Sequence, residues 1–557
     1  MRQNAGKNAF VLGCLLLCAV PVAVAAQSSI APTTQASWVI SGIVRSASSG
    51  LPLEGATVTL TNAKNFQHVA EALSDEKGQF SISGLPAGKF EVVASQRGYV
   101  SSAFNEHHGV STAIVTGEGL VSEGLEIKLE LQGVIAGTIT EDSGDPVPNA
   151  RLSLYRRDPR SGTGRMIRAS ATSADPMGNY ELAHLAPGTY YLCASGTPWY
   201  AANGMAKQDI SSSGAANSSR TALDVAYPIT CFPGVADPNA AEAITVGAGD
   251  HVPANLVLHA VPSVHISIRV PAPEANKGLL MPQLREDTFG NSEFIAGNYT
   301  NMIPNGDSTT TIEISGIAPG QYSAVFPDQS GEATRFATIN ALTDHETLDL
   351  SSAVPLPEVS GKITISGGGT LPSGLFVMLD PLEGEQRGRA PVQPDGSFHL
   401  KVARLGDYEV VVGNQRGTAL SVIGLKSSAG KLSGRVLPLG GESIELTVEV
   451  TAAQTTVSGF AQLDGKPSSS VFLVLVPDHP KAGHTAWKPN QSDSDGSFNF
   501  LHVSPGDYTV VAIQEGWTLD WARPEVISPF LAGGVKVHVS ANAKEIDLSR
   551  PVNAQSK

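Results

Sequence analysis

This sequence is short of charged residues, of basic residues in particular, and of long apolar runs. Charged residues make up 16% of the 557, and acidic residues outnumber basic ones by 52 to 37. The net charge of −15, which becomes −17 once Arg2 and Lys7 leave with a leader, argues against nucleic acid or an anionic membrane as a partner. Beyond the N-terminus no segment approaches the ~20 apolar residues of a membrane-spanning helix. The mature chain is therefore predicted to have no membrane span.

The common signatures of enzymes are also missing. The sequence contains no Gly-x-Ser-x-Gly, no His-Glu-x-x-His, no Cys-x-x-Cys and no Gly-x-x-x-x-Gly-Lys. These patterns mark serine hydrolases, zinc proteases, redox or metal sites, and phosphate-binding loops. We therefore predict no catalytic residue, no metal ligand and no cofactor, and a protein that is not an enzyme.

Two short motifs resemble metal-binding sites. His68-Val-Ala-Glu71 spells the His-x-x-Glu of metallocarboxypeptidases, with His184 as a third ligand, but these residues fall in two different repeats. Asp493-Ser-Asp495-Gly496 resembles the opening of a calcium loop and equally well a tight turn, since it lacks the later acidic ligand of an EF-hand. We prefer no zinc for the first motif and a turn for the second.

The N-terminus predicts export. Arg2 and Lys7 precede an apolar run over residues 10–24, and small residues follow at 23–26, so residues 1–26 are predicted to be a signal peptide. Cys14 follows a lipobox-like Val-Leu-Gly, but most of the apolar run lies after it, which disfavours a lipoprotein. The protein is expected in the periplasm, at the cell surface or outside the cell.

Removal of the leader leaves two cysteines, Cys193 and Cys231. Two cysteines in one module of an exported protein are predicted to form a disulfide. The Ser/Ala/Asn/Gly-rich stretch 201–222 between them is predicted to be a flexible loop.

One phrase recurs along the chain: an acidic turn, a large apolar residue, a second turn and an aromatic residue. In five copies the two large residues stand ten positions apart, as Phe80 and Phe90, Tyr180 and Tyr190, Ile312 and Tyr322, Phe398 and Tyr408, and Phe498 and Tyr508. Alternation of apolar and polar residues on both sides of the second turn predicts two β-strands, which we interpret as a hairpin. Because Phe90 stands where the other copies carry Tyr, the second aromatic residue is expected to act mainly through burial, and a hydroxyl bond of the tyrosine-corner kind can matter only in some copies.

About seven short strands per ~100 residues, separated by turn signals, are typical of a β-sandwich. Gly and Pro number 57 and 36, a composition of strands and turns. The chain is therefore predicted to be all-β, a tandem array of about five seven-stranded Ig-like or transthyretin-like sandwiches after the signal peptide. The predicted domains are 36–132, 133–262 with a long loop, 263–353, 354–453 and 454–551, the third and fourth being divergent.

The repeated motifs also resemble a known family. Gly42-x-Val44, Gly55-Ala56-x-Val58-x-Leu60, Asp75-x-x-Gly78-x-Phe80 and Leu85-Pro-x-Gly88-x-Phe90 are similar to the carboxypeptidase regulatory-like domain. The resemblance is close over 38–131 and 133–195, good over 454–515 and partial elsewhere. It implies a transthyretin-like sandwich without catalytic residues; relatives accompany peptidases, starch-binding-like folds or outer-membrane receptors.

Aromatic residues supply the remaining functional hint. Trp199 and Tyr200 follow a strand of the second module, and Trp487, Trp517 and Trp521 fall in the last one. Exposed rings of this kind stack on sugars, while buried ones fill contacts between domains. We predict a non-catalytic structural or binding protein of the cell envelope, with an envelope protein or a polysaccharide as partner. The alternatives are a carbohydrate-binding protein with starch-binding-like modules and, behind it, an accessory part of a peptidase or outer-membrane transport system.

Overall fold

The structure is a computed structural model, and it confirms an all-β, multi-domain protein with 57% strand and 4% helix. The predicted signal peptide (1–26) and nearly all of the predicted loop 201–222 lie outside the described residues. The described residues are 37–557 except 202–221, 273–280, 296–297, 328–332, 345, 383–386, 403, 415–418, 429–431, 433–434, 453–454, 479–485 and 541–542.

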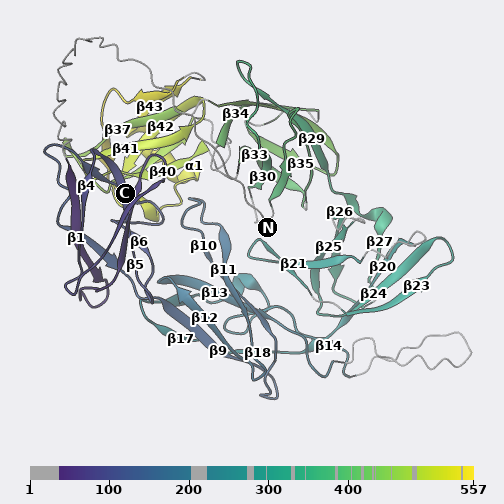
Figure 1. Ribbon diagram of the computed structural model, residues 1–557. Coiled ribbons are helices and arrows are strands. Elements are labelled where there is room, and N and C mark those ends of the chain that lie inside the picture. Colours follow the sequence, from purple (N-terminus) through teal and green to yellow (C-terminus); the bar gives the residue numbers. More distant parts are fainter. Residues whose placement is uncertain are drawn as a thin grey trace, which may run out of the picture. The chain divides into compact units, whose positions relative to one another are not determined.

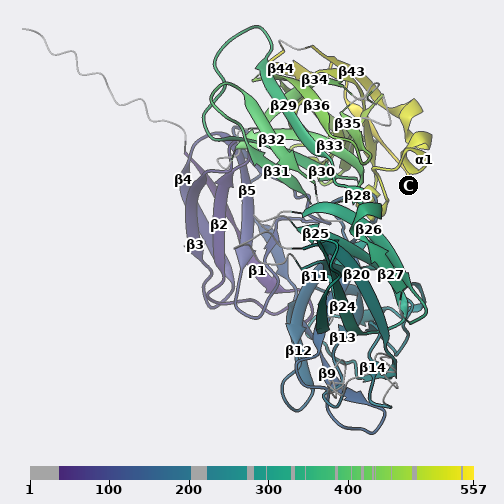
Figure 2. The same cartoon turned by 90° about the vertical axis from the view of Figure 1, so that its right-hand side faces the viewer.

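Sandwich 1 has two sheets, coloured purple in Figure 1 and labelled side by side in Figure 2. Its strands are β1 (Trp38–Ser46), β2 (Thr57–Asn62), β3 (His68–Leu73), β4 (Gln79–Leu85), β5 (Gly88–Ser95), β6 (Ser102–Ala103), β7 (Ile114–Thr116) and β8 (Leu125–Leu129). One sheet has the order β4-β1-β8, and the other has the order β3-β2-β5-β6 with β7 beside β5. Side chains from both sheets, among them Ile40, Val58 and Phe90, form one buried core.

Sandwich 2 repeats this plan. Its elements are β9 (Gly133–Glu141), β10 (Arg151–Arg157), β11 (Met166–Ser173), β12 (Asn179–Leu185), β13 (Gly188–Ser195), β14 (Val225–Ala226), β15 (Thr230–Cys231), η1 (Pro238–Ala240), β16 (Ile244–Val246), β17 (His251–Pro253), β18 (Leu256–Leu258) and β19 (Val261–Pro262). The sheets run β12-β9-β17, with β18 also beside β9, and β11-β10-β13-β15, with β16 beside β13. A separate pair joins β14 to β19.

Sandwich 3 has the sheets β23-β24-β20-β27 and β22-β21-β25-β26-β28. Its elements are β20 (Val264–Pro271), β21 (Gln283–Thr288), β22 (Asn291–Phe294), β23 (Asn298–Pro304), β24 (Thr309–Ile317), β25 (Gly320–Pro327), β26 (Ala333–Ala341), β27 (Glu346–Asp349), η2 (Leu350–Ser352) and β28 (Val354–Pro355). β28 pairs with β26 although it lies just past the start of the predicted fourth domain.

In sandwiches 4 and 5 one strand bridges the two sheets. β34 pairs with both β33 and β36 in sandwich 4, and β45 pairs with both β37 and β42 in sandwich 5. Sandwich 4 comprises β29 (Glu358–Ile365), β30 (Leu375–Pro381), β31 (Gly388–Pro391), β32 (Ser397–Lys401), β33 (Gly406–Asn414), β34 (Ala419–Ser427), β35 (Val436–Leu439) and β36 (Ile444–Thr451). Sandwich 5 comprises β37 (Thr455–Leu463), β38 (Lys466–Pro467), β39 (Phe472–Pro477), β40 (Lys488–Gln491), β41 (Ser497–Val503), β42 (Gly506–Ile513), η4 (Gly516–Thr518), α1 (Pro524–Ile527), η5 (Ser528–Gly533), β43 (Val535–Val539), β44 (Glu545–Asp547) and β45 (Val552–Gln555).

Each sandwich has its own cluster of buried side chains. The five clusters span 40–129, 135–258, 264–353, 359–450 and 457–552. They fall within the five predicted domains, apart from Val552, which lies one residue past the predicted end of the last. The domain boundaries themselves remain a prediction.

The repeated phrase is not a hairpin, and that interpretation was wrong. β4 pairs with β1, whereas β5 pairs with β2, β6 and β7, so the chain crosses from one sheet to the facing sheet at the turn between β4 and β5. The same crossing separates β12 from β13, β24 from β25, β32 from β33 and β41 from β42. The alternation of apolar residues is the same for both arrangements, because each strand presents one face to the core.

A side-chain hydroxyl forms a hydrogen bond at each of these crossings. The hydroxyl of each Tyr donates to the carbonyl oxygen four residues earlier, at 2.6 Å for Tyr190, 2.5 Å for Tyr322, 2.8 Å for Tyr408 and 2.9 Å for Tyr508. In sandwich 1 the residue is Phe90, and the Thr116 hydroxyl donates instead to the equivalent carbonyl, that of Pro86, at 2.8 Å. A side-chain hydroxyl bond is therefore present at all five crossings, from tyrosine in four and from a threonine in the fifth, so the second aromatic residue contributes more than burial.

A glycine faces the first large residue across the strand pair. Gly42 is the Cα partner of Phe80, and Gly137, Gly361 and Gly459 are the partners of Tyr180, Phe398 and Phe498. A Cβ on Gly361 would lie 2.7 Å from the Phe398 ring and closer still to the Leu446 carbonyl oxygen. In sandwich 3 both positions are changed together, to Ile268 and Ile312. At Gly361 the glycine therefore leaves space for both the ring and the neighbouring strand, whereas at Gly42 and Gly137 the nearest atoms belong to the neighbouring segment of chain.

Candidate functional site: the contact region around Trp517 and Trp521

Sandwich 5 carries an aromatic layer outside its main core. β39 is buried along its whole length because its second face is covered by this layer, which includes Trp487, Trp521 and Ile527. The Trp521 ring centroid lies 6.3 Å from that of Phe472, and Trp521 is 4% exposed. Trp517, in η4, is half-buried beside this layer.

A loop of sandwich 2 lies directly on this layer. The loop joins β10 to β11, and its Gly162 carbonyl accepts a hydrogen bond from the Ala522 backbone at 2.8 Å. The Arg523 guanidinium donates to the Thr163 carbonyl at 2.6 Å. A Cβ on Gly162 would lie 2.5 Å from the Trp521 ring, and the φ angle of +64° also favours glycine. The close approach of this loop to Trp521 therefore depends on glycine at position 162.

A segment of sandwich 1, residues 105–115, contacts the same part of sandwich 5. The His107 ring stacks on Trp517, with centroids 3.9 Å apart and planes 16° apart. Its Nδ1 donates to Gln491 Oε1 at 3.0 Å, since that oxygen can only accept. The amide nitrogen of Gln491, a fully buried residue, donates to the Asn105 carbonyl at 2.7 Å and to Thr112 Oγ1 at 2.8 Å. All three hydrogen-bonding positions used by this amide belong to sandwich 1.

A buried ion pair lies in the same contact. Lys89 Nζ is 2.6 Å from Asp493 Oδ2 and 2.8 Å from Ser497 Oγ, and the side chains of Lys89 and Asp493 are 17% and 10% exposed. Burial raises the pKa of Asp493, and the adjacent Lys89 acts in the opposite direction. Backbone groups join as well, because Ser494 N–H donates to the Ala113 carbonyl at 2.9 Å. Sandwiches 1 and 5 are therefore joined by side-chain and main-chain bonds together.

These bonds account for the motif at Asp493 to Gly496. Asp493 accepts from Lys89, and Asp495 accepts from the Ser497 backbone at 2.9 Å, as expected for a turn. Within the described ranges no group of three or more His, Cys, Asp or Glu side chains is placed to hold a metal ion. The hydrogen bond of Asp495 is that of a turn.

The zinc motif is divided between two sandwiches. His68 lies 3.8 Å from Glu71 on the surface of β3 in sandwich 1. His184 belongs to β12 of sandwich 2, where its Nδ1 lies 2.7 Å from Gln132 Oε1. The arrangement agrees with the preference for no zinc at this motif.

A cavity of about 230 Å³ lies where the three sandwiches meet. His107, His108 and Val110 of sandwich 1, Arg160 of sandwich 2, and Trp517 and Trp521 of sandwich 5 are among its lining residues. A larger hollow of about 870 Å³ shares part of this lining. Partial burial and the neighbouring His107 lower the pKa of His108 below its ordinary value.

The structure thus divides the predicted aromatic site residues into two groups. Trp487, Trp517 and Trp521 lie together, with Trp487 and Trp521 buried, which favours packing for these two. Trp199 lies in sandwich 2, is 72% exposed and meets Tyr200 edge to face at 5.7 Å. The sequence did not indicate that residues 105–115 and the Gly162 loop contribute, because neither carries a motif.

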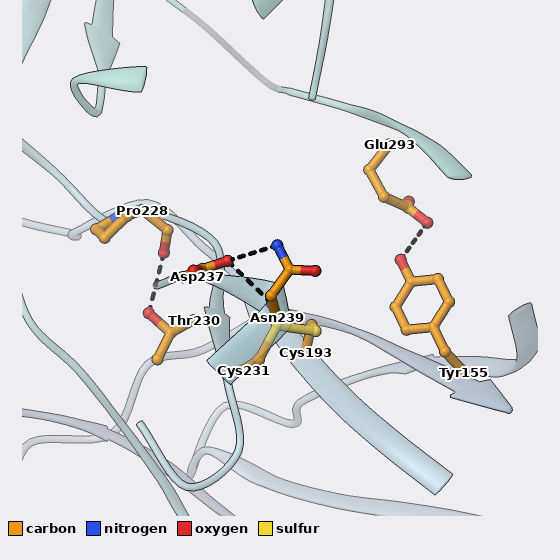
Figure 3. The surroundings of a disulfide bond; sticks show 8 residues. All are labelled: Tyr155, Cys193, Pro228, Thr230, Cys231, Asp237, Asn239 and Glu293. Carbon is orange, nitrogen blue, oxygen red and sulfur yellow. Dashed lines mark hydrogen bonds between the residues drawn. A yellow bond between two sulfur atoms is a disulfide. The ribbon is translucent and has the colours of Figure 1, made fainter. Parts of the chain in front are cut away.

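The structure has a disulfide between Cys193 and Cys231, which are Cα partners on β13 and β15 (Figure 3). It belongs to a small buried cluster with Tyr155. Figure 3 shows the Tyr155 hydroxyl pointing to Glu293 of sandwich 3, to which it donates at 2.6 Å. Arg168 donates to both oxygens of the same carboxylate at 3.1 Å. The disulfide therefore packs in the same buried cluster as Tyr155, the side chain that joins sandwich 2 to sandwich 3.

One family model matches residues within the first sandwich. Residues 39–116 match the model of the carboxypeptidase regulatory-like domain, which confirms the resemblance indicated by the motifs. A search of curated proteins finds no match. No helix of the described residues is long and apolar enough to cross a membrane.

Several solved structures show a remote likeness. The minor pilin GBS52 of Streptococcus agalactiae is 15% identical, covers 40% of this chain and 96% of its own, and has a TM-score of 0.21. A streptococcal ancillary pilin is 11% identical, covers 56% and 98%, and has a TM-score of 0.20. A variant of BcpA, the major pilin subunit of Bacillus cereus, is 9% identical, covers 94% and 99%, and has a TM-score of 0.14. At such TM-scores the likeness carries no argument about function.

Proposed function

We propose that the chain is a non-catalytic structural and binding protein of the cell envelope, exported by its signal peptide. The observation that carries the proposal is that buried charged side chains form contacts between sandwiches. Lys89 and Asp493 join sandwich 1 to sandwich 5, and Glu293 joins sandwich 3 to Tyr155 and Arg168 of sandwich 2. These buried charged side chains are engaged in holding sandwiches together.

The proposed partner is an envelope protein or a polysaccharide, and nucleic acid is not expected for so acidic a chain. One observation favours the polysaccharide. The exposed Trp199 ring beside Tyr200 offers an aromatic surface of the kind that stacks on sugars. A carbohydrate-binding protein is therefore the second candidate function.

Co-sedimentation with isolated cell envelopes tests the proposal. The mature chain is mixed with untreated envelopes, with protease-treated envelopes and with the purified polysaccharide fraction. We expect the chain to bind untreated envelopes saturably. If the partner is a protein, binding is lost on protease-treated envelopes. If the partner is a polysaccharide, the chain also binds the purified polysaccharide fraction. A Trp199→Ala variant is expected to lose only polysaccharide binding. Multiple-turnover hydrolysis of an envelope component by the purified chain, or no binding in any arm, would contradict the proposal.

A further inference from the structure

The cavity between the three sandwiches has one cationic group in an otherwise mostly uncharged lining. Val110, Pro159, Phe472, Pro489 and the two tryptophans supply apolar and aromatic surface, and Arg160 supplies the guanidinium. Small-molecule sites in proteins are commonly apolar hollows with a few placed polar groups. The cavity has this composition.

Arg160 differs from two neighbouring arginines, Arg157 at the end of β10 and Arg165 in the same loop. Arg157 lies 3.8 Å from Asp520, and Arg165 lies 3.5 Å from Asp158. Arg160 is exposed, and none of the ion pairs formed by the described residues includes it. The Arg160 charge therefore remains available to an anion.

The exposed side chain of Arg160 lies against Gly109 of sandwich 1. A Cβ on Gly109 would lie 2.5 Å from Arg160 Nε and 3.0 Å from its Cγ. Gly109 also has a φ angle of +85°, which disfavours other residues. Glycine at this position lets the arginine side chain lie against sandwich 1 at the edge of the cavity.

We propose that this cavity binds a carboxylate on a ring-sized body, with the carboxylate on Arg160 and the ring against Trp517 and Trp521. Guanidinium groups bind carboxylates in a two-pronged geometry, and aromatic side chains pack on flat apolar faces. A volume of about 230 Å³ suits a single ring. Two sources share this chemistry, a uronic acid unit of an acidic polysaccharide and a small aromatic acid. The inference deepens the proposed binding role and rests on it.

Tryptophan fluorescence and calorimetry on the full mature chain test the site. The probes are methyl galacturonide with methyl galactoside as its neutral match, and benzoate with benzyl alcohol as its neutral match. We expect one acid to bind at least tenfold more tightly than its neutral match, and the acid that binds identifies the source. Arg160→Gln is expected to lower that affinity at least tenfold, whereas Arg97→Gln, an exposed arginine outside the cavity, is expected to leave it unchanged.

A second variant guards against an effect on folding. Val110→Phe reduces the cavity volume without changing charge, and it is expected to abolish binding while circular dichroism and the melting temperature show a folded chain. Binding that both variants retain, or no binding of either acid, overturns the inference. The co-sedimentation result is independent of these probes, so loss of the cavity site leaves the envelope role to be judged separately.

Discussion

Glu286 is a carboxyl group placed in a poor environment for charge. It lies on β21, and burial raises its pKa to about 7, against about 4.3 in an unfolded chain. Because the folded state then holds the proton more tightly, this group costs stability progressively as the pH rises from about 4.3 through 7.

Glu286→Gln is therefore expected to stabilise sandwich 3 at pH 8 by about 1–3 kcal/mol and to have little effect at pH 4. Calorimetric melting at the two pH values measures the difference. Glu54→Gln, a change at an exposed carboxylate, serves as the control and is expected to be neutral at both. An equal effect of Glu286→Gln at pH 4 and pH 8 would refute the assigned pKa.

The sheet crossings depend on one hydroxyl each. Tyr508→Phe removes the donor to the Ser504 carbonyl inside sandwich 5, and Thr116→Val removes the donor to the Pro86 carbonyl in sandwich 1. Each change is expected to cost about 1–2 kcal/mol, because a part-buried carbonyl loses its partner.

The hydroxyl that Thr116 supplies in sandwich 1 can be moved to position 90, where the other copies carry tyrosine. Phe90→Tyr in the Thr116→Val background is expected to recover part of the lost stability, since the hydroxyl then comes from position 90 as in the other four copies. Urea unfolding of the three variants beside the parent chain measures this. A double variant no more stable than Thr116→Val alone would show that the two hydroxyls are not equivalent.

The glycine opposite the first large residue is a second requirement of these strands. Gly361→Ala places a methyl group against the Leu446 carbonyl and the Phe398 ring, and is expected to destabilise sandwich 4 by about 2–3 kcal/mol. Gly440→Ala, in the same sandwich with nothing within 4 Å of its Cβ, is the matched control. Thermal unfolding distinguishes them, and equal melting temperatures would contradict the packing argument.

Sequence periodicity predicted the strands but not how they connect. The spacing between Phe80 and Phe90 indicated two apolar strand faces, yet a hairpin and a crossing between sheets share that pattern. The contact region was beyond prediction for a different reason. His107 and Gly162 belong to separate repeats, and nothing in a periodic pattern tells which repeats meet. The tryptophans were found from composition alone, and burial of Trp521 is decided by the loop of another sandwich.

At the scale of the whole chain, the contact between sandwiches 1 and 5 can be captured covalently. Thr112 Oγ1 and Ser470 Oγ lie 2.9 Å apart, so cysteines at both positions have their sulfurs within reach. The oxidised Thr112→Cys/Ser470→Cys variant is expected to be a monomer that migrates faster than its reduced form in a denaturing gel. Each single variant is the control and is expected to show only the smaller change that comes from reducing the native Cys193–Cys231 bond. Disulfides formed only between different chains would contradict an intramolecular contact.

The ion pair between Lys89 and Asp493 also sets an order of events during biogenesis. Its two residues are 404 positions apart, so sandwich 1 leaves the ribosome long before its docking surface can be covered by sandwich 5. Until then Thr112, which is 1% exposed in the finished protein, must face water or a chaperone. Contacts of such sequence separation form late and slow the final step of folding. Sandwich 5 therefore covers the docking surface of sandwich 1 late in folding.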